Sequence, residues 1–350
     1  MNTIFILLLA VVLAAVLGWG FKYLPGERWQ FLAAVPLYKK KNGSWRSVNF
    51  TYYGFFVATS QLLAIILALC LLGSIKASIL GTCIVLTAVL LVCIPAARIV
   101  AMIVEKKRHT FTIGGASFAG IVLAPWAILA SQQILTLTTS NHYLPILPLL
   151  AAFSIAYTMG EGLGRLACLS FGCCYGKPVD QAPPFLQKIF RRVNTVFHGE
   201  HKKAAYESNL CDVPLIPIQA ITSVIYSIAT VAGTYCFLHG YFSAALLMTI
   251  ATTQLWRIIS ETMRADFRGF SKISAYQKMG LIAVIYMSVV VLTVPRTELV
   301  HPIITQGLSN LWNPSVIVGL QLLWFIAFFF FGKSTMTTST LHFSLIKKNI

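Results

Sequence analysis

The chain has 350 residues, of which 57% are hydrophobic and only 11% are charged, and its mean hydropathy is +0.77. Soluble domains carry about a quarter charged residues, so this composition excludes a soluble globular domain and a disordered chain. The net charge of +17 comes from basic residues in short segments between apolar stretches, which favours anionic lipid headgroups over nucleic acid as partners. We therefore predict an all-α polytopic membrane protein with a small extramembrane cap.

A helix needs about 20 apolar residues to cross the hydrocarbon core of a bilayer. Nine segments meet this length, namely residues 3–21, 53–73, 77–104, 115–137, 143–162, 215–238, 241–263, 279–295 and 314–332. The first, within residues 1–23, is either an added span or a signal peptide. It lacks a positively charged start and is longer than the usual apolar region of a signal peptide, so we expect a retained span.

Two segments outside these spans carry polar residues. Residues 24–50 are basic and contain the apolar stretch WQFLAAVPLY, which predicts a segment lying along the membrane interface. Residues 165–213 form the largest polar stretch, and we interpret them as a signature turn followed by the cap. The remaining divisions are core spans in residues 51–164 and 214–296, and an added span with a tail in residues 297–350.

The basic residues are distributed unevenly between the two membrane faces. If nine spans alternate in direction, 25 of the 27 Lys and Arg residues lie on the face that carries the cap. Only Lys76 and Arg296 lie on the other face. The positive-inside rule then places the cap in the cytoplasm.

Several ionisable residues lie inside or at the ends of apolar spans, where they are costly and often functional. Arg98 lies in the third span, and Glu161 and Arg165 lie four residues apart at the end of the fifth. In the seventh span, Arg257, Glu261 and Arg264 are spaced to share one helical face. A single Arg at a span end is usually a snorkelling residue or half of an ion pair. Converging guanidinium groups, in contrast, suit the bidentate binding of a phosphodiester.

Glycine and cysteine residues cluster around Arg165. The glycines at 160, 162, 164, 172 and 176 allow close backbone approach to a ligand, or close packing of membrane helices. Cys168, Cys173 and Cys174 have a C-x4-C-C spacing, which does not match the paired C-x2-C of structural zinc sites. We therefore predict no metal site and no cofactor, and interpret these cysteines as small residues in a tight turn. A nucleophilic Cys173 or Cys174 activated by Arg165 is the less favoured alternative.

A series of motifs resembles, in chain order, those of the prolipoprotein diacylglyceryl transferase family. The segment GLGRLACLSFGCCYGKPVD at 162–180 resembles the family signature, and LWRIISETMRAD at 255–266 resembles its F-R-I-I-V-E-F-x-R-x-P-D motif. Shorter matches are TYYGFF at 51–56, AARIV at 96–100, GGASFAG at 114–120, PIQ at 217–219 and SAYQKMG at 274–280. The resemblance covers roughly residues 45–295, as a core of seven spans with one added span at each end.

The resemblance implies a bacterial inner-membrane enzyme without a cofactor that acts in lipoprotein biosynthesis. Its substrates are phosphatidylglycerol and the lipobox cysteine of a prolipoprotein, and its products are a thioether and glycerol phosphate. The residues that the resemblance and the charge pattern assign to catalysis are Arg165, Arg257 and Glu261, with Glu261 orienting Arg257. Those assigned to substrate binding are Tyr53, Arg98, Gly114, Gly115, Ser117, Gly164, Gly172, Gly176, Gln219 and Arg264.

The chain departs from the family pattern at several polar positions. Ala119 stands where the family has a histidine, and Cys168 stands where it has an asparagine. Cys173, Ile216 and Thr222 also replace polar family residues. The alternatives are a paralogue that binds phosphatidylglycerol but uses another acceptor or is non-catalytic, and, less favoured, a transporter. The family orientation places the cap outside the cytoplasm, against the charge distribution, and the sequence leaves this open.

Overall fold

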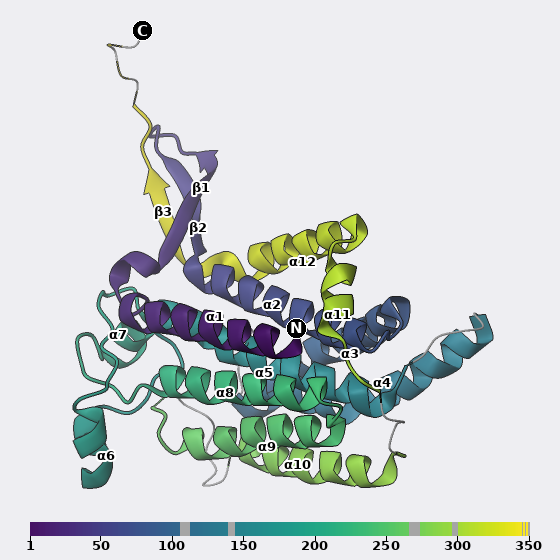
Figure 1. The fold of residues 1–350 in the computed structure, drawn as a ribbon. Helices are drawn as coiled ribbons and strands as arrows, with labels where there is room; N and C mark the ends of the chain where they lie inside the picture. Colours follow the sequence, from purple (N-terminus) through teal and green to yellow (C-terminus); the bar gives the residue numbers. More distant parts are fainter. Residues whose placement is uncertain are drawn as a thin grey trace.

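The computed structural model describes residues 1–105, 113–138, 144–265, 274–295, 300–344, 346 and 348. Within these residues, nine helices are long and apolar enough to cross a membrane. They are α1 (Asn2–Tyr23), α2 (Tyr52–Ser74), α3 (Ile79–Val100), α4 (Ile113–Thr138), α5 (Ile146–Phe171), α8 (Ile218–Leu238), α9 (Phe242–Glu261), α10 (Ala275–Thr293) and α12 (Pro314–Gly332). The predicted all-α polytopic architecture is confirmed, and each of the nine predicted spans corresponds to one of these helices (Figure 1).

Of the spans that carry predicted site residues near the cap, α3 matches the prediction and α5 does not. Helix α3 passes through Pro95 and continues into a π-helical turn, η2 (Ala101–Glu105), which matches the predicted long third span. Helix α5 is longer than predicted and ends only at Phe171. Arg165 therefore lies inside a helix rather than in a turn. The cause is that the small residues between 160 and 168 pack closely against neighbouring helices, which outweighs the low helix propensity of glycine.

Helix α5 is the central element of the bundle. It packs against α2, α8 and α9, and it also contacts α1 and α4. In the most hydrophobic stretch of α5, 78% of the residues are buried, and Leu149, Ala151 and Ile155 have no exposed surface. Interhelical hydrogen bonds support this packing, since Thr249 Oγ1 of α9 donates to Ser154 Oγ at 2.8 Å and Ser223 Oγ of α8 donates to Gly162 O at 2.7 Å.

Most of the segment predicted to lie along the membrane interface is a β-hairpin, residues 31–51, which the sequence analysis did not predict. Strand β1 (Phe31–Lys39) pairs antiparallel with β2 (Trp45–Thr51), and β2 also pairs antiparallel with β3 (Lys333–Leu341) from the chain's tail, so β2 is the central strand. The sheet projects from the cap end of α2 and α12 (Figure 1). Two signals were available, the Asn42–Gly43 pair in the hairpin loop and the threonine-rich sequence of β3.

Helices outside the family-like core pack on α2. A short helix, α11 (Ile304–Leu311), approaches so closely that a Cβ on Gly307 would lie 1.9 Å from Cys70 O. The end of α12 packs equally closely against the start of α2, where a Cβ on Gly54 would lie 2.0 Å from the Cα of Gly332. Thr51 Oγ1 donates to Gly332 O at 3.0 Å and fixes the junction of the two helices with the sheet.

The cap consists of short elements between α5 and α8, namely η3 (Val179–Gln181), α6 (Pro184–Phe190) and α7 (Lys203–Ser208); another short turn, η1 (Glu27–Trp29), follows α1. Lys202 joins the cap to the bundle. Its ammonium group is buried and donates to Leu24 O at 3.1 Å and to Ser170 O at 2.6 Å, at the ends of α1 and α5. Burial lowers the pKa of Lys202 from 10.5 to about 7, although nearby Glu27 acts in the opposite direction.

Candidate functional site

The carboxylate of Glu161, in the second half of α5, is the centre of a buried charged cluster. Arg165, one turn later on the same helix, donates from Nη2 to Glu161 Oε1 at 2.7 Å. Arg257 of α9 donates from Nη2 to both carboxylate oxygens, each at 2.8 Å. Only 3% of the Glu161 side chain and 11% of each arginine side chain are exposed. The two guanidinium groups predicted to converge therefore do so, through a shared carboxylate.

Further hydrogen bonds fix Arg257 between three helices. Its Nη1 donates to Ser117 Oγ of α4 at 2.8 Å, and its Nη2 also donates to the hydroxyl of Tyr157 at 3.0 Å. The Tyr157 hydroxyl in turn donates to Glu161. Gly114 lies next to this group, since a Cβ there would lie 3.3 Å from Arg257 Nη1 and 2.6 Å from Tyr276 Cδ1. The predicted residues Arg257, Ser117 and Gly114 thus form one cluster.

The cluster holds an unbalanced charge and an unused donor. Two guanidinium groups share one carboxylate, so the group carries a net charge of +1. The Nε of Arg165 is buried and has no hydrogen-bond partner among the described residues. An unpaired buried donor is costly, so this arrangement favours the binding of a ligand that carries one negative charge and accepts hydrogen bonds, such as a phosphodiester.

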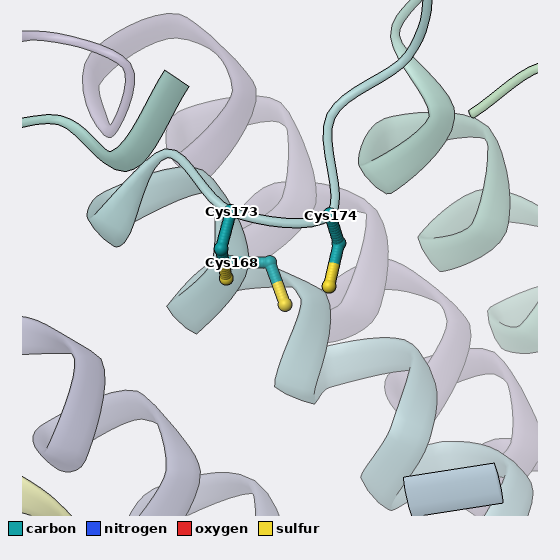
Figure 2. A group of neighbouring side chains, drawn as sticks. All are labelled: Cys168, Cys173 and Cys174. Carbon is teal, nitrogen blue, oxygen red and sulfur yellow. The ribbon is translucent and has the colours of Figure 1, made fainter. Parts of the chain in front are cut away.

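Three thiols converge beside Arg165. Gly172, with φ of +74°, ends α5, and the backbone N–H groups of Gly172 and Cys173 both donate to Cys168 O, at 2.8 and 3.1 Å. This turn folds the chain back so that Cys173 and Cys174 lie over the last turn of the helix (Figure 2). The Sγ atoms of Cys168, Cys173 and Cys174 all lie within 4.8 Å of one another.

The protonation state of these thiols argues against a free nucleophile. Hydrogen bonds with the thiols of Cys168 and Cys174, and to a lesser extent burial, hold the pKa of Cys173 well above its usual value. At neutral pH the uncoordinated Cys173 is therefore a neutral thiol, and the thiolate rather than the thiol is the nucleophilic form.

Tyr53 and Gln219 border the cysteine turn from two other helices. The ring of Tyr53 packs on Phe171 with 5.5 Å between centroids, and its hydroxyl is close enough to Arg165 and the three thiols to interact electrostatically. Gln219, at the start of α8, donates from Nε2 to Cys173 O at 2.8 Å. Its Oε1 is buried and has no partner among the described residues. Both residues thus lie at the edge of the candidate site.

The structure corrects the predicted role of Glu261 and shows where Arg264 and Arg98 lie. Glu261 does not orient Arg257: it accepts a hydrogen bond from Ser274, while the carboxylate that contacts Arg257 is Glu161. Helix α9 ends at Glu261, so Arg264 lies beyond the helix; its backbone bridges to Gly176, and its charge acts on Arg165. Arg98 is exposed, and its side chain forms no ion pair or hydrogen bond within the described part of the chain. The spacing argument failed because it assumed that α9 continues through residue 264.

The remaining predicted glycines lie where helices pack closely or where the backbone turns. A Cβ on Gly164 would meet Ser60 of α2 at 3.5 Å, and one on Gly115 would meet Val100 of α3 at 2.5 Å. Gly172 is required by its positive φ, and a Cβ on Gly176 would lie 2.3 Å from Ile216 O. Helix packing and turn geometry therefore explain these four positions.

Sequence reasoning did not assign Tyr157 or Glu161 to the site. The signal for Glu161 was its position in an apolar span four residues before Arg165, where a carboxylate needs a cationic partner. Tyr157 lies one further turn back on the same face of α5. Extending the Glu161–Arg165 pair by one turn would have found it.

Comparison with known proteins agrees with this geometry. The family model of prolipoprotein diacylglyceryl transferases matches residues 44–293, which include the whole charged cluster and the cysteine turn. A search of curated proteins finds no match to this chain. The matched region covers most of the chain and leaves out α1, η1, β1, α11, α12 and β3. The chain belongs to the prolipoprotein diacylglyceryl transferase family, whose members are membrane-embedded transferases of lipoprotein biosynthesis.

Proposed function

We propose that this protein, in the bacterial inner membrane, transfers the diacylglyceryl group of phosphatidylglycerol to the cysteine thiol of a prolipoprotein. The products are a thioether and glycerol phosphate. The observation that carries the proposal is the shared carboxylate: Arg165 and Arg257 meet on Glu161 and leave a net charge of +1 in a buried site. A phosphatidylglycerol headgroup is a monoanionic phosphodiester and would neutralise this charge.

The cluster suits the chemistry of the leaving group. When the acceptor sulfur attacks the glyceryl carbon, the bond from that carbon to the phosphate oxygen breaks, and negative charge increases on the departing glycerol phosphate. Fixed guanidinium donors in a water-poor site stabilise such developing charge without reorganising. The Nε of Arg165, which has no partner among the residues that the structure describes, can donate to the phosphate, and Ser117, Tyr157 and Glu161 hold Arg257 in place. Glu161 therefore acts as a positioning residue rather than as a proton acceptor.

The position of the cluster suits a lipid donor. It lies within the helices α4, α5 and α9, and α5 ends at the cap only ten residues after Glu161. Ten helical residues correspond to about 15 Å along the axis, so the cluster lies below the cap end of the bundle, within reach of a headgroup drawn in from the adjacent leaflet.

The test is a transfer assay with purified protein, phosphatidylglycerol labelled in its glyceryl-linked acyl chains, and a lipobox peptide. We expect lipidated peptide and glycerol phosphate in equal amounts. Arg257→Ala removes the donor held by four hydrogen bonds and is expected to lower turnover by about 10²–10³-fold, the cost of removing one charge-stabilising donor. Arg191→Ala, on the exposed end of α6, is the matched control and is expected to retain turnover.

Two failures of this assay have different meanings. Glycerol phosphate release without lipidated peptide would contradict the prolipoprotein acceptor and favour transfer to another nucleophile. Neither product, in an assay that an active family member passes, would contradict the enzyme and leave the non-catalytic lipid-binding paralogue. The replacement of the family histidine by Ala119 is the observation that favours this second candidate.

A further inference from the structure

We propose that Cys168, Cys173 and Cys174 form a zinc site with an open fourth position, at which the acceptor thiol binds and loses its proton. The inference rests on the proposed function for the identity of the acceptor, but the metal site itself rests only on the geometry of the three cysteines. The zinc ion would deprotonate the acceptor thiol. The histidine that the resemblance implies as a candidate base is replaced by Ala119 in this chain.

The geometry fits one metal ion. Three sulfur atoms bound to zinc at about 2.3 Å in tetrahedral directions lie about 3.8 Å apart. The three Sγ atoms here lie within 4.8 Å of one another, so each pair has to approach by about 1 Å or less. Side-chain rotation supplies a shift of this size without moving the backbone. Figure 2 shows the thiols of Cys173 and Cys174 directed from the turn toward the last turn of α5, where Cys168 lies.

The backbone of the turn is held from both sides. Gln219 of α8 donates to Cys173 O at 2.8 Å. Beyond Cys174, the N–H of Lys177 donates to Met263 O at 3.0 Å, and the N–H of Ala265 donates to Tyr175 O at 3.1 Å. Cys174 itself has a φ of +57°, an unfavourable value for a residue other than glycine. This strained position directs its thiol toward the other two, as expected where a turn is built to hold a ligand.

The charge around the thiols also fits. Three thiolates and one Zn²⁺ carry a net charge of −1. Arg165 lies three residues before Cys168 on the same face of α5, and its guanidinium interacts electrostatically with Cys168 and Cys174. An anionic zinc–thiolate complex thus has a cationic neighbour in a poorly hydrated site, whereas three thiolates without a metal would be strongly disfavoured.

Three protein ligands leave one position of a tetrahedral zinc ion open, as in catalytic zinc sites. Within the described part of the chain, no fourth Cys, His, Asp or Glu joins the cluster. A thiol that coordinates zinc is deprotonated outright, and its proton passes to solvent. The bound sulfur then attacks the glyceryl carbon: a C–S bond forms, the C–O bond to phosphate breaks, and the electron pair leaves with glycerol phosphate beside Arg165.

The first experiment measures metal content and needs no activity. Purified protein is loaded with Zn²⁺, freed of excess metal by gel filtration, and assayed by elemental mass spectrometry. We expect one zinc ion per chain in the wild type, and its loss in Cys168→Ser, Cys173→Ser and Cys174→Ser. Cys236→Ser, in α8 away from the turn, is the matched control and should keep the ion. A wild type without zinc, or cysteine variants that retain it, would overturn the site.

Cobalt substitution tests the open position. Co²⁺ bound by three thiolates gives intense near-ultraviolet sulfur-to-metal charge-transfer absorption, and we expect this band to increase when a lipobox peptide is added. A peptide with serine in place of cysteine is the control and should leave the spectrum unchanged. A spectrum that does not respond to the cysteine peptide would contradict acceptor coordination. A mass lower by two hydrogens in the loaded wild type would show a disulfide instead of a metal site.

Activity then separates this inference from the proposed function. A free thiol with a pKa of about 8.5 is only about 3% thiolate at pH 7, so loss of zinc should lower turnover by up to about 30-fold at pH 7, and by less above pH 8.5. The cationic groups that interact electrostatically with the thiols are Arg165 and Lys203, and Tyr53 and Tyr206 also lie close to them. Glu161 and Arg264 act on Arg165 in turn. Zinc binding without any transfer would contradict the proposed function but leave the metal site. Full transfer by the zinc-free cysteine variants would contradict the role of zinc but leave the function. Retained phosphatidylglycerol binding by the cysteine variants shows that they are folded.

Discussion

Helices α5 and α12 are both long apolar segments, yet they occupy opposite environments. Helix α5 lies inside the bundle and α12 lies at its edge (Figure 1). In the most hydrophobic stretch of each helix, 78% of the residues of α5 are buried, against 6% of those of α12. Helix α12 contains no charged residue, and its aromatic side chains contact α2, β2 or one another, or are exposed. Helix α5, in contrast, carries Tyr157, Glu161, Arg165 and Cys168. The comparison teaches that the more polar helix is the more buried one, because bilayer lipid solvates apolar side chains but not charged ones.

The largest loss of stability is expected when the negative charge that α5 supplies to the two arginines is removed. Glu161→Gln leaves two guanidinium groups buried with no carboxylate between them, and we expect a loss of about 3–5 kcal/mol in stability. Thermal unfolding in detergent, followed by scanning fluorimetry, measures it. Added phosphatidylglycerol should recover part of the loss, because its phosphate supplies an anion. An unchanged unfolding midpoint would mean that the cluster is hydrated and that burial does not define it.

A matched pair of apolar truncations sharpens the comparison. Ile155→Ala in α5 removes atoms from a side chain with no exposed surface and should cost about 2–5 kcal/mol through the cavity that it leaves. Ile326→Ala in α12 changes a side chain that is 66% exposed to the surroundings, and surface substitutions of this kind typically stay within about 0.5 kcal/mol. The same unfolding assay compares both. Equal losses would show that α12 is covered by protein.

An effect smaller than that of Ile155→Ala is expected for the lysine that joins the cap to the ends of α1 and α5. Lys202→Met keeps the length of the side chain but leaves the carbonyls of Leu24 and Ser170 without this donor, which should cost about 1–3 kcal/mol. The pKa of Lys202 is lowered to about 7 in the folded protein, so between pH 7 and 10.5 the unfolded chain binds more protons at this site. The contribution of Lys202 to stability therefore rises with pH across this window.

The measurement for Lys202 is the difference in unfolding midpoint between wild type and Lys202→Met at pH 6 and pH 9. Taking the difference cancels the other groups that titrate in this range. We expect a larger difference at pH 9 than at pH 6. A larger difference at pH 6 would show that the charged ammonium, rather than the neutral amine, is the form that the two carbonyls stabilise.

Hydropathy was sufficient to predict the spans, because the bilayer requires a fixed length of apolar helix and the chain has few charges to blur the boundaries. The pairing of β2 with β3 was missed because the two strands lie nearly 300 residues apart, whereas the β1–β2 hairpin had a local signal, Asn42–Gly43, that was not used. In the site, the convergence of Arg165 and Arg257 was predicted from charge inside spans. The carboxylate that joins them was misassigned to Glu261, because helical spacing indicates a shared face but not where the helix ends. The meeting of three thiols depends on the turn at Gly172, and their C-x4-C-C spacing alone did not indicate it.

The central claim is that Arg165 and Arg257, joined by Glu161, hold the phosphodiester of an anionic lipid. The most direct test is native mass spectrometry of the detergent-purified protein with phosphatidylglycerol and, as the zwitterionic comparison, phosphatidylcholine. The account predicts that the wild type and Arg191→Ala retain more phosphatidylglycerol than phosphatidylcholine. In Arg257→Ala the ratio of retained phosphatidylglycerol to phosphatidylcholine should fall by roughly tenfold or more, the equivalent of about 1.4 kcal/mol. Equal retention of phosphatidylglycerol by Arg257→Ala and Arg191→Ala would contradict it.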